Sequence, residues 1–515
     1  MRNNIGLFLA KRAEWSPDLE GYIGCDPPCR FSYRELNARC NRIAQALLKL
    51  GVKKGDRVAL LLMNGSEYVE SFFAVAKIGA IAVPINWRLV PDELAFILKD
   101  SGATVLIFGH DFAEAAADLH ARGPEGTAVG EWISAGASGE PLDFAHDYDA
   151  LCADSADDEP AIGADDDEEL YIMYTSGTTG RPKGAVHTHN TAMWACITIN
   201  ATADMRYRDR YLIALPLFHV GALTPLTSNV LRGVTSVVMR SFDPTACWQV
   251  IEQEQISVAL AVPAMLNFML QTPAHEQTDY SQLRWIMSGA APVPVTLIEE
   301  YEKLGIEVHQ VYGLTETCGP ACLISPEDAL RKAGSTGKAF FHTDVRVVKE
   351  GGDDVAGDEV GEVLVRGAHI MKGYWNRPDA TAETVRNGWL HSGDLATMDS
   401  DGFVFIQDRK KDMIISGGEN IYPAEIEDVI LKHPGVKEVA VIGQPSAKWG
   451  ESPLAVVVKA TDDLTEAAVL EHCQGKMAGY KLPKKVEFVD EVPRNPTGKV
   501  LKRILREQFP GDESG

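Results

Sequence analysis

Apolar and polar positions in the first part of the chain follow a helical spacing in some segments and a strand-like spacing in others. Ser32 to Glu35 has the form of a capping box, and the apolar residues behind it share one helical face, so we predict a helix that ends at Gly51. A second helix is predicted at 68–78. Buried strands are predicted at three short apolar runs, residues 58–62, 81–85 and 104–108. This β-α-β rhythm predicts an α/β fold made of layers.

The spacing changes after residue 335. Short alternating runs between Gly and Asp turns predict a small antiparallel sheet or a β-barrel-like part, at residues 345–348, 361–365 and 403–406. A dense cluster of charged residues follows at 408–412. Beyond it, two helices and two strands predict a compact α+β unit. We therefore predict a large N-terminal domain at 1–408 and a small C-terminal domain at 413–515.

Composition and charge narrow the class of function. The chain has 515 residues, of which 45% are hydrophobic and 24% charged, which is typical of a globular enzyme with a large core. The net charge of −24 argues against a nucleic-acid partner, because a phosphate backbone requires a basic surface. More than half of this charge lies in residues 140–169, which contain thirteen acidic residues and no Lys or Arg. We interpret this segment as a solvated linker.

The cysteines and the apolar runs indicate a cytoplasmic protein. Nine cysteines are scattered along the chain without a C-x-x-C pair, which favours free thiols in a reducing compartment over disulfides or a zinc site. The N-terminal apolar run is too short for a signal peptide. The longest apolar stretch, 257–270, is too short to span a membrane and is interrupted by Pro263 and Asn267.

The strongest chemical signal is a loop rich in small residues, Tyr174 to Gly184, which follows a strand-like run. Small residues let the backbone close around a phosphate, hydroxyl and N–H groups donate to its oxygens, and Lys183 adds positive charge. The P-loop pattern requires Gly where this chain has Pro182, so we predict a phosphate loop of another kind. Its predicted nucleotide contacts are Thr175, Ser176, Gly177, Thr178, Thr179, Gly180 and Lys183.

This loop resembles the phosphate loop of the adenylate-forming superfamily, which contains acyl-CoA synthetases, aryl-CoA ligases, luciferases and adenylation domains. Four more segments resemble the family's motifs in the same order along the chain: 312–317, 388–394, 408–427 and 493–499. Five motifs in order, spread over residues 30–505, identify the chain as a member. Its sequence is most similar to bacterial fatty-acid–CoA ligases of the mycobacterial long-chain type.

The resemblance implies a ligase reaction with ATP, Mg²⁺ and CoA. A carboxylic acid would attack the α-phosphate of ATP to give an acyl-adenylate and pyrophosphate, a step that needs charge neutralisation more than acid–base chemistry. CoA would then displace AMP after the small, mobile domain has rotated about a hinge at 409–412. The family pattern places the pivot of this hinge at Lys411. In the rotated state the pantetheine arm would pass along Ser416, Gly417 and Gly418.

The resemblance also implies the roles of individual residues. Lys499 would be the catalytic cation that neutralises charge during adenylation, and it lies in a locally basic segment of this acidic chain. Glu316 would bind Mg²⁺, assisted by Thr175. Asp394 and Arg409 would contact the ribose. The remaining nucleotide contacts are expected from Gly289, Ala290, Ala291, Tyr312, Gly313 and Thr315.

The acyl site is expected around His219, which matches the family's aromatic gate beside the reacting carboxylate. The predicted pocket is apolar, which disfavours an amino-acid substrate, and consists of His219, Val220, Gly221, Val262 and Ala264. Some long-chain members have Trp where this chain has Leu223. A medium- to long-chain fatty acid is therefore predicted, with aryl and alicyclic acids left open.

Two other classes of function remain as alternatives. An acyl-AMP ligase that feeds a carrier protein would share only the first half-reaction. A non-catalytic nucleotide sensor would be expected to have lost Lys499 or Glu316, and both are present. Peripheral membrane contact and a homodimer are left open.

Overall fold

The computed structural model describes residues 3–136, 142–161, 163–175, 182–291, 293–357, 359–410, 412–416, 419–446, 450–474, 476–477, 479–494 and 500–511. The chain divides into two compact units. Unit 1 comprises residues 1–345 and 365–391, and unit 2 comprises 346–364 and 392–515. The domain boundary that we predicted from the charged cluster lies inside unit 2 and stays a prediction.

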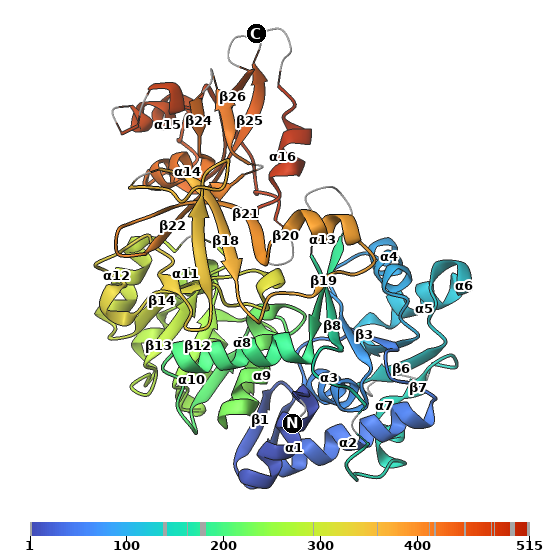
Figure 1. Cartoon of the computed structure of the whole chain (residues 1–515). Coiled ribbons are helices and arrows are strands. Elements are labelled where there is room, and N and C mark those ends of the chain that lie inside the picture. The colour runs from blue at the N-terminus through green and yellow to red at the C-terminus, as the bar shows by residue number, and fades with distance from the viewer. Residues whose placement is uncertain are drawn as a thin grey trace. The chain divides into compact units, whose positions relative to one another are not determined.

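Unit 1 contains an eight-stranded sheet that includes the three predicted strands (Figure 1). Its strands, in spatial order, are β19 (Gly373–Tyr374), β9 (Lys183–Thr188), β8 (Glu169–Thr175), β4 (Ile81–Pro84), β3 (Arg57–Leu61), β5 (Val105–Gly109), β6 (Glu131–Ala135) and β7 (His146–Asp147). Strand β3 pairs in parallel with β4 and β5, as expected for β-α-β units. Strands β8 and β9 instead form an antiparallel hairpin.

The helices of this half of unit 1 follow the predicted pattern. Helix α2 begins at the predicted Ser32–Glu35 capping box, and α3 is buried from Tyr68 to its end at Ile78. Helices α1, α2 and α3 pack on one another. The helices are α1 (Ile5–Trp15), α2 (Tyr33–Lys49), α3 (Ser66–Ile78), α4 (Pro91–Ser101), α5 (Ala113–Ala121), α6 (Gly123–Gly126), α7 (Tyr148–Ala153) and α8 (His189–Thr202).

A second, nine-stranded sheet completes unit 1, and its central strands are parallel. In spatial order they are β16 (Lys338–Ala339), β15 (Cys322–Leu323), β14 (Glu307–Tyr312), β13 (Trp285–Ser288), β12 (Val258–Ala261), β10 (Arg210–Ile213), β11 (Thr235–Val238), β1 (Glu20–Cys25) and β2 (Pro28–Ser32). The connecting helices are α9 (Val220–Arg232), α10 (Pro244–Gln253), α11 (Pro263–Leu270) and α12 (Val295–Lys303), and α13 (Pro378–Thr384) follows β19.

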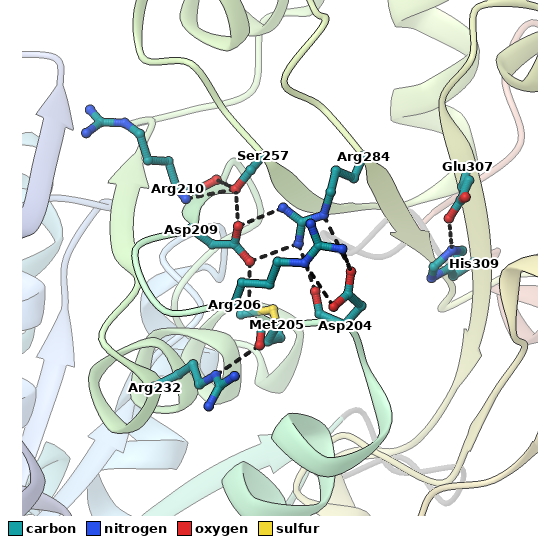
Figure 2. Close-up of polar contacts among 10 residues, drawn as sticks. All are labelled: Asp204, Met205, Arg206, Asp209, Arg210, Arg232, Ser257, Arg284, Glu307 and His309. Atoms are coloured by element: carbon teal, nitrogen blue, oxygen red, sulfur yellow. Dashed lines mark hydrogen bonds and ion pairs between the residues drawn. The ribbon is translucent and has the colours of Figure 1, made fainter.

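A polar network joins the amino-terminal ends of β10, β12 and β13 (Figure 2). Asp209, just before β10, accepts hydrogen bonds from the hydroxyl of Ser257 at 2.9 Å and from the guanidinium of Arg284 at 2.7 Å. His309 and Glu307 interact at 3.0 Å on β14. Parallel sheets bind ligands at the carboxyl ends of their strands. The network lies at the amino-terminal ends, so it stabilises the sheet at the edge opposite to the expected ligand site.

The acidic segment is mostly exposed to solvent, as expected, but it is docked on unit 1 and contains β7 and α7 instead of forming a free linker. Residues 154–159 dock on a polar stripe of α2, where side chains spaced by one helical turn donate to their carbonyl or carboxylate oxygens: Asn37, Asn41, Gln45 and Lys49. Further along, Lys54 pairs with Glu168 and Lys372 with Glu169. A run of like charges is stable here because unit 1 supplies a cation or an amide donor along much of its length.

Two sheets carry most of unit 2. The part expected to resemble a barrel is a five-stranded sheet that lies mostly in unit 2, whereas its strand β20 falls in unit 1. Its strands are β17 (Asp344–Val348), β18 (Gly361–Arg366), β20 (Val385–Arg386), β21 (Trp389–Met398) and β22 (Val404–Arg409). The predicted α+β unit contains β23 (Ile414–Ser416), β24 (Glu419–Ile421), β25 (Val436–Ser446), β26 (Gly450–Lys459), β27 (Lys485–Phe488), α14 (Pro423–Leu431), α15 (Glu466–Cys473) and α16 (Lys502–Gln508).

Two expectations about the whole chain can be compared with the structure. All nine cysteines are unpaired, as predicted, and burial raises the pKa of several of them, including that of Cys152 to about 12. In the described part of the chain, every helix is too short or too polar to cross a lipid bilayer.

Candidate active site

The fold brings several predicted site residues to one edge of the nine-stranded sheet. Strands β10, β12, β13 and β14 are neighbours and parallel, so their carboxyl ends meet at the same edge. The segments that leave these ends contain His219, Val262, Gly289 and Gly313. Ligands of open α/β sheets bind at such an edge. Predicted site residues that are distant in sequence therefore lie at the same edge of this sheet in unit 1.

Backbone packing explains the two glycines at this edge. A Cβ atom on Gly289 would lie 2.2 Å from the carbonyl oxygen of Val311, and one on Gly313 would lie 1.4 Å from that of Gly319. Neither position can accept a side chain without a backbone shift. Ala290, which follows Gly289, has a φ of +67°. The contacts predicted for Gly289, Ala290, Ala291, Tyr312, Gly313 and Thr315 with the nucleotide stay predictions.

The phosphate loop is the tip of the β8–β9 hairpin. Thr175 and Lys183 are cross-strand partners at its end, and the Thr175 hydroxyl lies 3.4 Å from the Lys183 carbonyl oxygen. The predicted residues between them, Ser176, Gly177, Thr178, Thr179 and Gly180, lie outside the described residues. The structure therefore defines both ends of the loop, and both ends carry a predicted ligand-binding side chain.

Glu316 lies beside this hairpin, in the short 3₁₀ helix η3 (Thr315–Thr317). The hydroxyl of Tyr374 donates to Glu316 Oε1 at 2.8 Å, and the ammonium of Lys183 lies 5.1 Å from the centre of the Tyr374 ring. Tyr374 was missed by the sequence analysis, because an aromatic residue in a short strand is not a distinctive signal. Through Tyr374, the structure connects the predicted phosphate-binding cation to the predicted metal ligand.

A buried histidine fixes the main chain next to Glu316. His187 on β9 donates from Nε2 to the Thr315 carbonyl oxygen at 2.7 Å, and its Nδ1 lies 3.2 Å from the Thr191 hydroxyl. The tautomer is assigned from this network, since a carbonyl can only accept. On the other side, the amide of Met371 donates to the Glu316 carbonyl oxygen at 2.9 Å. The β9–β19 side of the eight-stranded sheet thus holds the Glu316 segment, which connects β14 and β15 of the nine-stranded sheet.

The donor set at Glu316 fits a magnesium ion carried by a nucleotide. Among the described residues no group of three His, Cys, Asp or Glu side chains forms a metal cage. Mg²⁺ is commonly held by one or two carboxylates together with substrate phosphates, so a single carboxylate beside a phosphate loop is sufficient. Of the described residues, only Tyr374 donates to the Glu316 carboxylate, at Oε1, and Oε2 is left for a cation.

His219 occupies the N-terminal cap position of α9 and is kept neutral by its surroundings. Burial, and secondarily the charge of Arg88, lowers the pKa of its imidazole to about 3. Its ring lies 4.3 Å from that of Phe218, centre to centre. His219 Nε2 is buried and makes no hydrogen bond within the described part of the chain. A buried polar atom without a partner costs free energy, so this nitrogen is suited to contact a bound ligand.

The predicted acyl pocket has an apolar environment where its packing is defined. A Cβ atom on Gly221 would meet Leu215 at 3.4 Å and Leu260 at 4.0 Å. Val220 and Val262 are partly buried against the core, whereas Ala264 is exposed. Leu223, at the position of the family's Trp gate, is buried in the core and 1% exposed. The lining of an acyl pocket by Val220, Gly221, Val262 and Ala264 stays a prediction.

Unit 2 contains the other predicted nucleotide contacts. Asp394 on β21 is 3% exposed and is the cross-strand partner of Arg409 on β22, so the two predicted ribose contacts share one strand pair. The amide of Asp394 donates to the Ser392 hydroxyl at 3.0 Å. Ser416 ends β23. The predicted residues Lys411, Gly417, Gly418 and Lys499 lie outside the described residues.

Four histidines whose pKa is lowered by burial should make the stability of the folded chain depend on pH. The folded-state pKa of His219 is about 3, against an ordinary value of 6.5. Below pH 6.5 the unfolded chain therefore binds a proton that the folded chain does not bind, and the folded state loses up to about 1.4 kcal/mol per pH unit. Burial also lowers the pKa values of His187, His189 and His369 to about 4. We expect thermal stability to fall steadily between pH 6.5 and 4.

Substitution of His219 tests this origin of the acid sensitivity. His219→Phe, which keeps an aromatic ring but cannot be protonated, should have a thermal midpoint that depends less steeply on pH between 6.5 and 4. The measurement is the thermal midpoint of wild type and variant by circular dichroism over this range. Parallel curves for the two proteins would show that His219 does not contribute.

Comparison with known proteins shows the family of this chain. Residues 9–375 match the family model of the AMP-binding enzyme, and residues 425–499 match its C-terminal domain. The chain is 48% identical over 507 residues, 98% of each chain, to the long-chain-fatty-acid–CoA ligase FadD13 of Mycobacterium tuberculosis. It is 41% identical to a feruloyl-CoA synthase of Amycolatopsis sp, covering 99% of this chain and 100% of the relative.

A solved structure gives the same fold over nearly the whole chain. The o-succinylbenzoate CoA synthetase of Bacillus subtilis, in complex with ATP and a magnesium ion, matches with a TM-score of 0.86 at 34% identity, covering 97% of this chain and 99% of that chain. These matches confirm the α/β fold with a large N-terminal and a small C-terminal domain. The chain belongs to the AMP-binding enzyme family.

Proposed function

We propose that this protein is an AMP-forming acyl-CoA ligase that activates a medium- to long-chain fatty acid. One observation carries the proposal: the same side chain, Tyr374, contacts both Lys183 and Glu316. Its ring faces the ammonium of Lys183, at the end of the β8–β9 hairpin, and its hydroxyl donates to the Glu316 carboxylate. This arrangement presents a cation and a hard oxygen ligand to the phosphates of ATP. The named relatives of this chain are CoA ligases or synthetases.

The proposed first half-reaction assigns a role to each predicted nucleotide-, metal- and carboxylate-binding residue. Lys183 and the hairpin tip bind the phosphates, while Asp394 and Arg409 bind the ribose. Glu316, with Thr175, would hold Mg²⁺, which supplies neutralisation of phosphate charge when bound. His219, neutral at physiological pH, orients the acid's carboxylate from its unpartnered Nε2. Lys499 stabilises the charge that builds as the carboxylate attacks the α-phosphate.

The second half-reaction is proposed to follow a rotation about Lys411. This rotation would remove Lys499 and place Ser416, Gly417 and Gly418 along the pantetheine arm, where the absence of side chains on the two glycines leaves room. The thiol of CoA then attacks the acyl carbon and AMP leaves. The nine unpaired cysteines support a cytoplasmic location for this chemistry.

The class of acid is proposed from the apolar surroundings of Gly221. Leu215 and Leu260 face this position, and a hydrocarbon chain is stabilised by such contacts. Aryl acids are the second candidate, because a feruloyl-CoA synthase is among the relatives. An acyl-AMP ligase that feeds a carrier protein, and a nucleotide sensor without catalysis, remain as further alternatives that one experiment separates.

We expect the protein to convert ATP to AMP and pyrophosphate, and to make no ADP. The reason is that Pro182 excludes the P-loop spacing and the five motifs are those of adenylation. The purified chain would be incubated with MgATP and hexadecanoic, octanoic, cyclohexanecarboxylic or ferulic acid, with and without CoA. Chromatography would then separate the nucleotides and thioesters.

The five possible outcomes of this experiment lead to different conclusions. AMP together with a fatty acyl thioester supports the proposal, and a thioester of ferulic acid alone would change the class of acid. Adenylate that accumulates without reacting with CoA would favour a carrier-protein ligase. Nucleotide binding without turnover of any acid would indicate a sensor, and stoichiometric ADP would contradict adenylation altogether.

A further inference from the structure

We infer that Tyr374 is a positioning residue that orients the Glu316 carboxylate toward the metal–nucleotide complex. This inference rests on the proposed function, in which Glu316 binds the cation. The observation behind it is the 2.8 Å hydrogen bond from the Tyr374 hydroxyl to Glu316 Oε1. This hydrogen bond explains how a single carboxylate can be held in the orientation that a divalent cation needs.

The main chain of Tyr374 is fixed on both sides. Its strand β19 pairs with β9, directly beyond the phosphate loop, with Tyr374 opposite Ala185. The amide of Trp375 donates to the Gly184 carbonyl oxygen at 2.7 Å, and the amide of Tyr374 donates to the Thr381 hydroxyl at 2.9 Å. The backbone that carries the phenol of Tyr374 is therefore held by β9, the second strand of the β8–β9 hairpin.

A phenol suits this task better than a charged donor. A lysine or arginine beside Glu316 would cancel the negative charge that attracts Mg²⁺, whereas a neutral hydroxyl orients the carboxylate and leaves its charge. Donation to Oε1 stops the carboxylate from rotating and directs Oε2 to the cation. The ring face of Tyr374 attracts the Lys183 ammonium, at 5.1 Å from its centre. One side chain thus fixes both charged groups.

Removing only the hydroxyl tests the role of this hydrogen bond. Tyr374→Phe keeps the ring beside Lys183 but leaves the Glu316 carboxylate without its donor. We expect Mn²⁺, used as a probe for Mg²⁺, to bind about tenfold more weakly in the presence of α,β-methylene-ATP, because loss of a partner that orients a ligand costs about 10–100-fold in metal affinity. Mn²⁺ binding is measured by electron paramagnetic resonance, without turnover.

A matched variant controls for the general effect of losing a tyrosine hydroxyl. Tyr301→Phe removes a buried hydroxyl on α12 that donates to the Leu266 carbonyl oxygen of α11 at 2.9 Å, a contact that involves neither Glu316 nor Lys183. It should leave Mn²⁺ affinity at the wild-type value. In a Glu316→Gln background, Tyr374→Phe should weaken Mn²⁺ binding no further, because the ligand on which it acts is already lost.

Each outcome supports or contradicts the inference separately from the proposed function. Unchanged Mn²⁺ affinity in Tyr374→Phe, with wild-type affinity for the analogue, would overturn the inference while the ligase activity stands. Equal weakening in Tyr301→Phe, or further weakening in the Glu316→Gln background, would also overturn it. If Glu316→Gln itself bound Mn²⁺ like wild type, Glu316 would not be the metal ligand and that part of the proposed function would fail.

Discussion

Replacement of Lys499 by alanine should slow acyl-adenylate formation by about 10²–10³-fold, the usual effect of removing one preorganised charge at a reacting centre. Negative charge accumulates around the α-phosphate only in the first transition state, so the contribution of this cation belongs to that step. Conversion of supplied acyl-adenylate to thioester should be nearly unchanged, since the proposed rotation removes Lys499 from the site. Single-turnover kinetics of each half-reaction would measure both rates.

The chain offers a matched control for this substitution. Arg503 is a nearby cation on α16 whose side chain is 66% exposed and paired with Glu507. Arg503→Ala should leave both half-reactions within about twofold of wild type, because an exposed charge is screened by water. If both half-reactions fell together in Lys499→Ala, the proposed division of labour between them would be wrong.

Replacement of Glu159 by glutamine should destabilise the folded chain by about 3 kcal/mol, because it leaves a buried ammonium unpaired. Lys77 lies on α3 with its side chain 0% exposed, and it interacts with Glu159 and donates to the Asn37 side chain at 2.9 Å. Burial alone would raise the pKa of Glu159, but Lys77 and two amide donors lower it below the ordinary value. The measurement is the urea midpoint of unfolding. The midpoints are converted to free energies with one m value, the slope of unfolding free energy against urea concentration, for wild type and variants.

A double-mutant cycle shows whether the buried charge is the cause. Lys77→Met should destabilise the chain less than Glu159→Gln, since its unpaired carboxylate is 37% exposed. Adding Glu159→Gln to Lys77→Met should then have little further effect. Glu168→Gln breaks an exposed pair with Lys54 in the same acidic run and should cost less than about 1 kcal/mol. A similar loss in all three single variants would contradict the argument.

This docked segment shows where the sequence alone was insufficient. Charge density predicted that residues 140–169 form a solvated linker. Their acidic side chains are mostly exposed, but nothing local to them indicates that the segment also docks on α2. Their partners lie on α2 and α3, at Lys54 and at Lys372 just before β19, and the amide and lysine stripe of α2 resembles an ordinary exposed helical face. Whether an acidic run is a free linker or is docked depends on cations and amide donors elsewhere in the chain, which only tertiary contacts bring into place.

The fold and the candidate site were also determined partly by the sequence alone and partly by tertiary contacts. The sequence by itself determined the local elements, such as the capped helix α2 and the strands β3 to β5, because capping and apolar periodicity act over a few residues. It also determined the family, because five motifs retain their order. Only the tertiary structure decided that Tyr374 contacts Glu316, that His187 holds Thr315 and that His219 is buried and neutral. These properties depend on burial and on partners distant in sequence, which local patterns do not record.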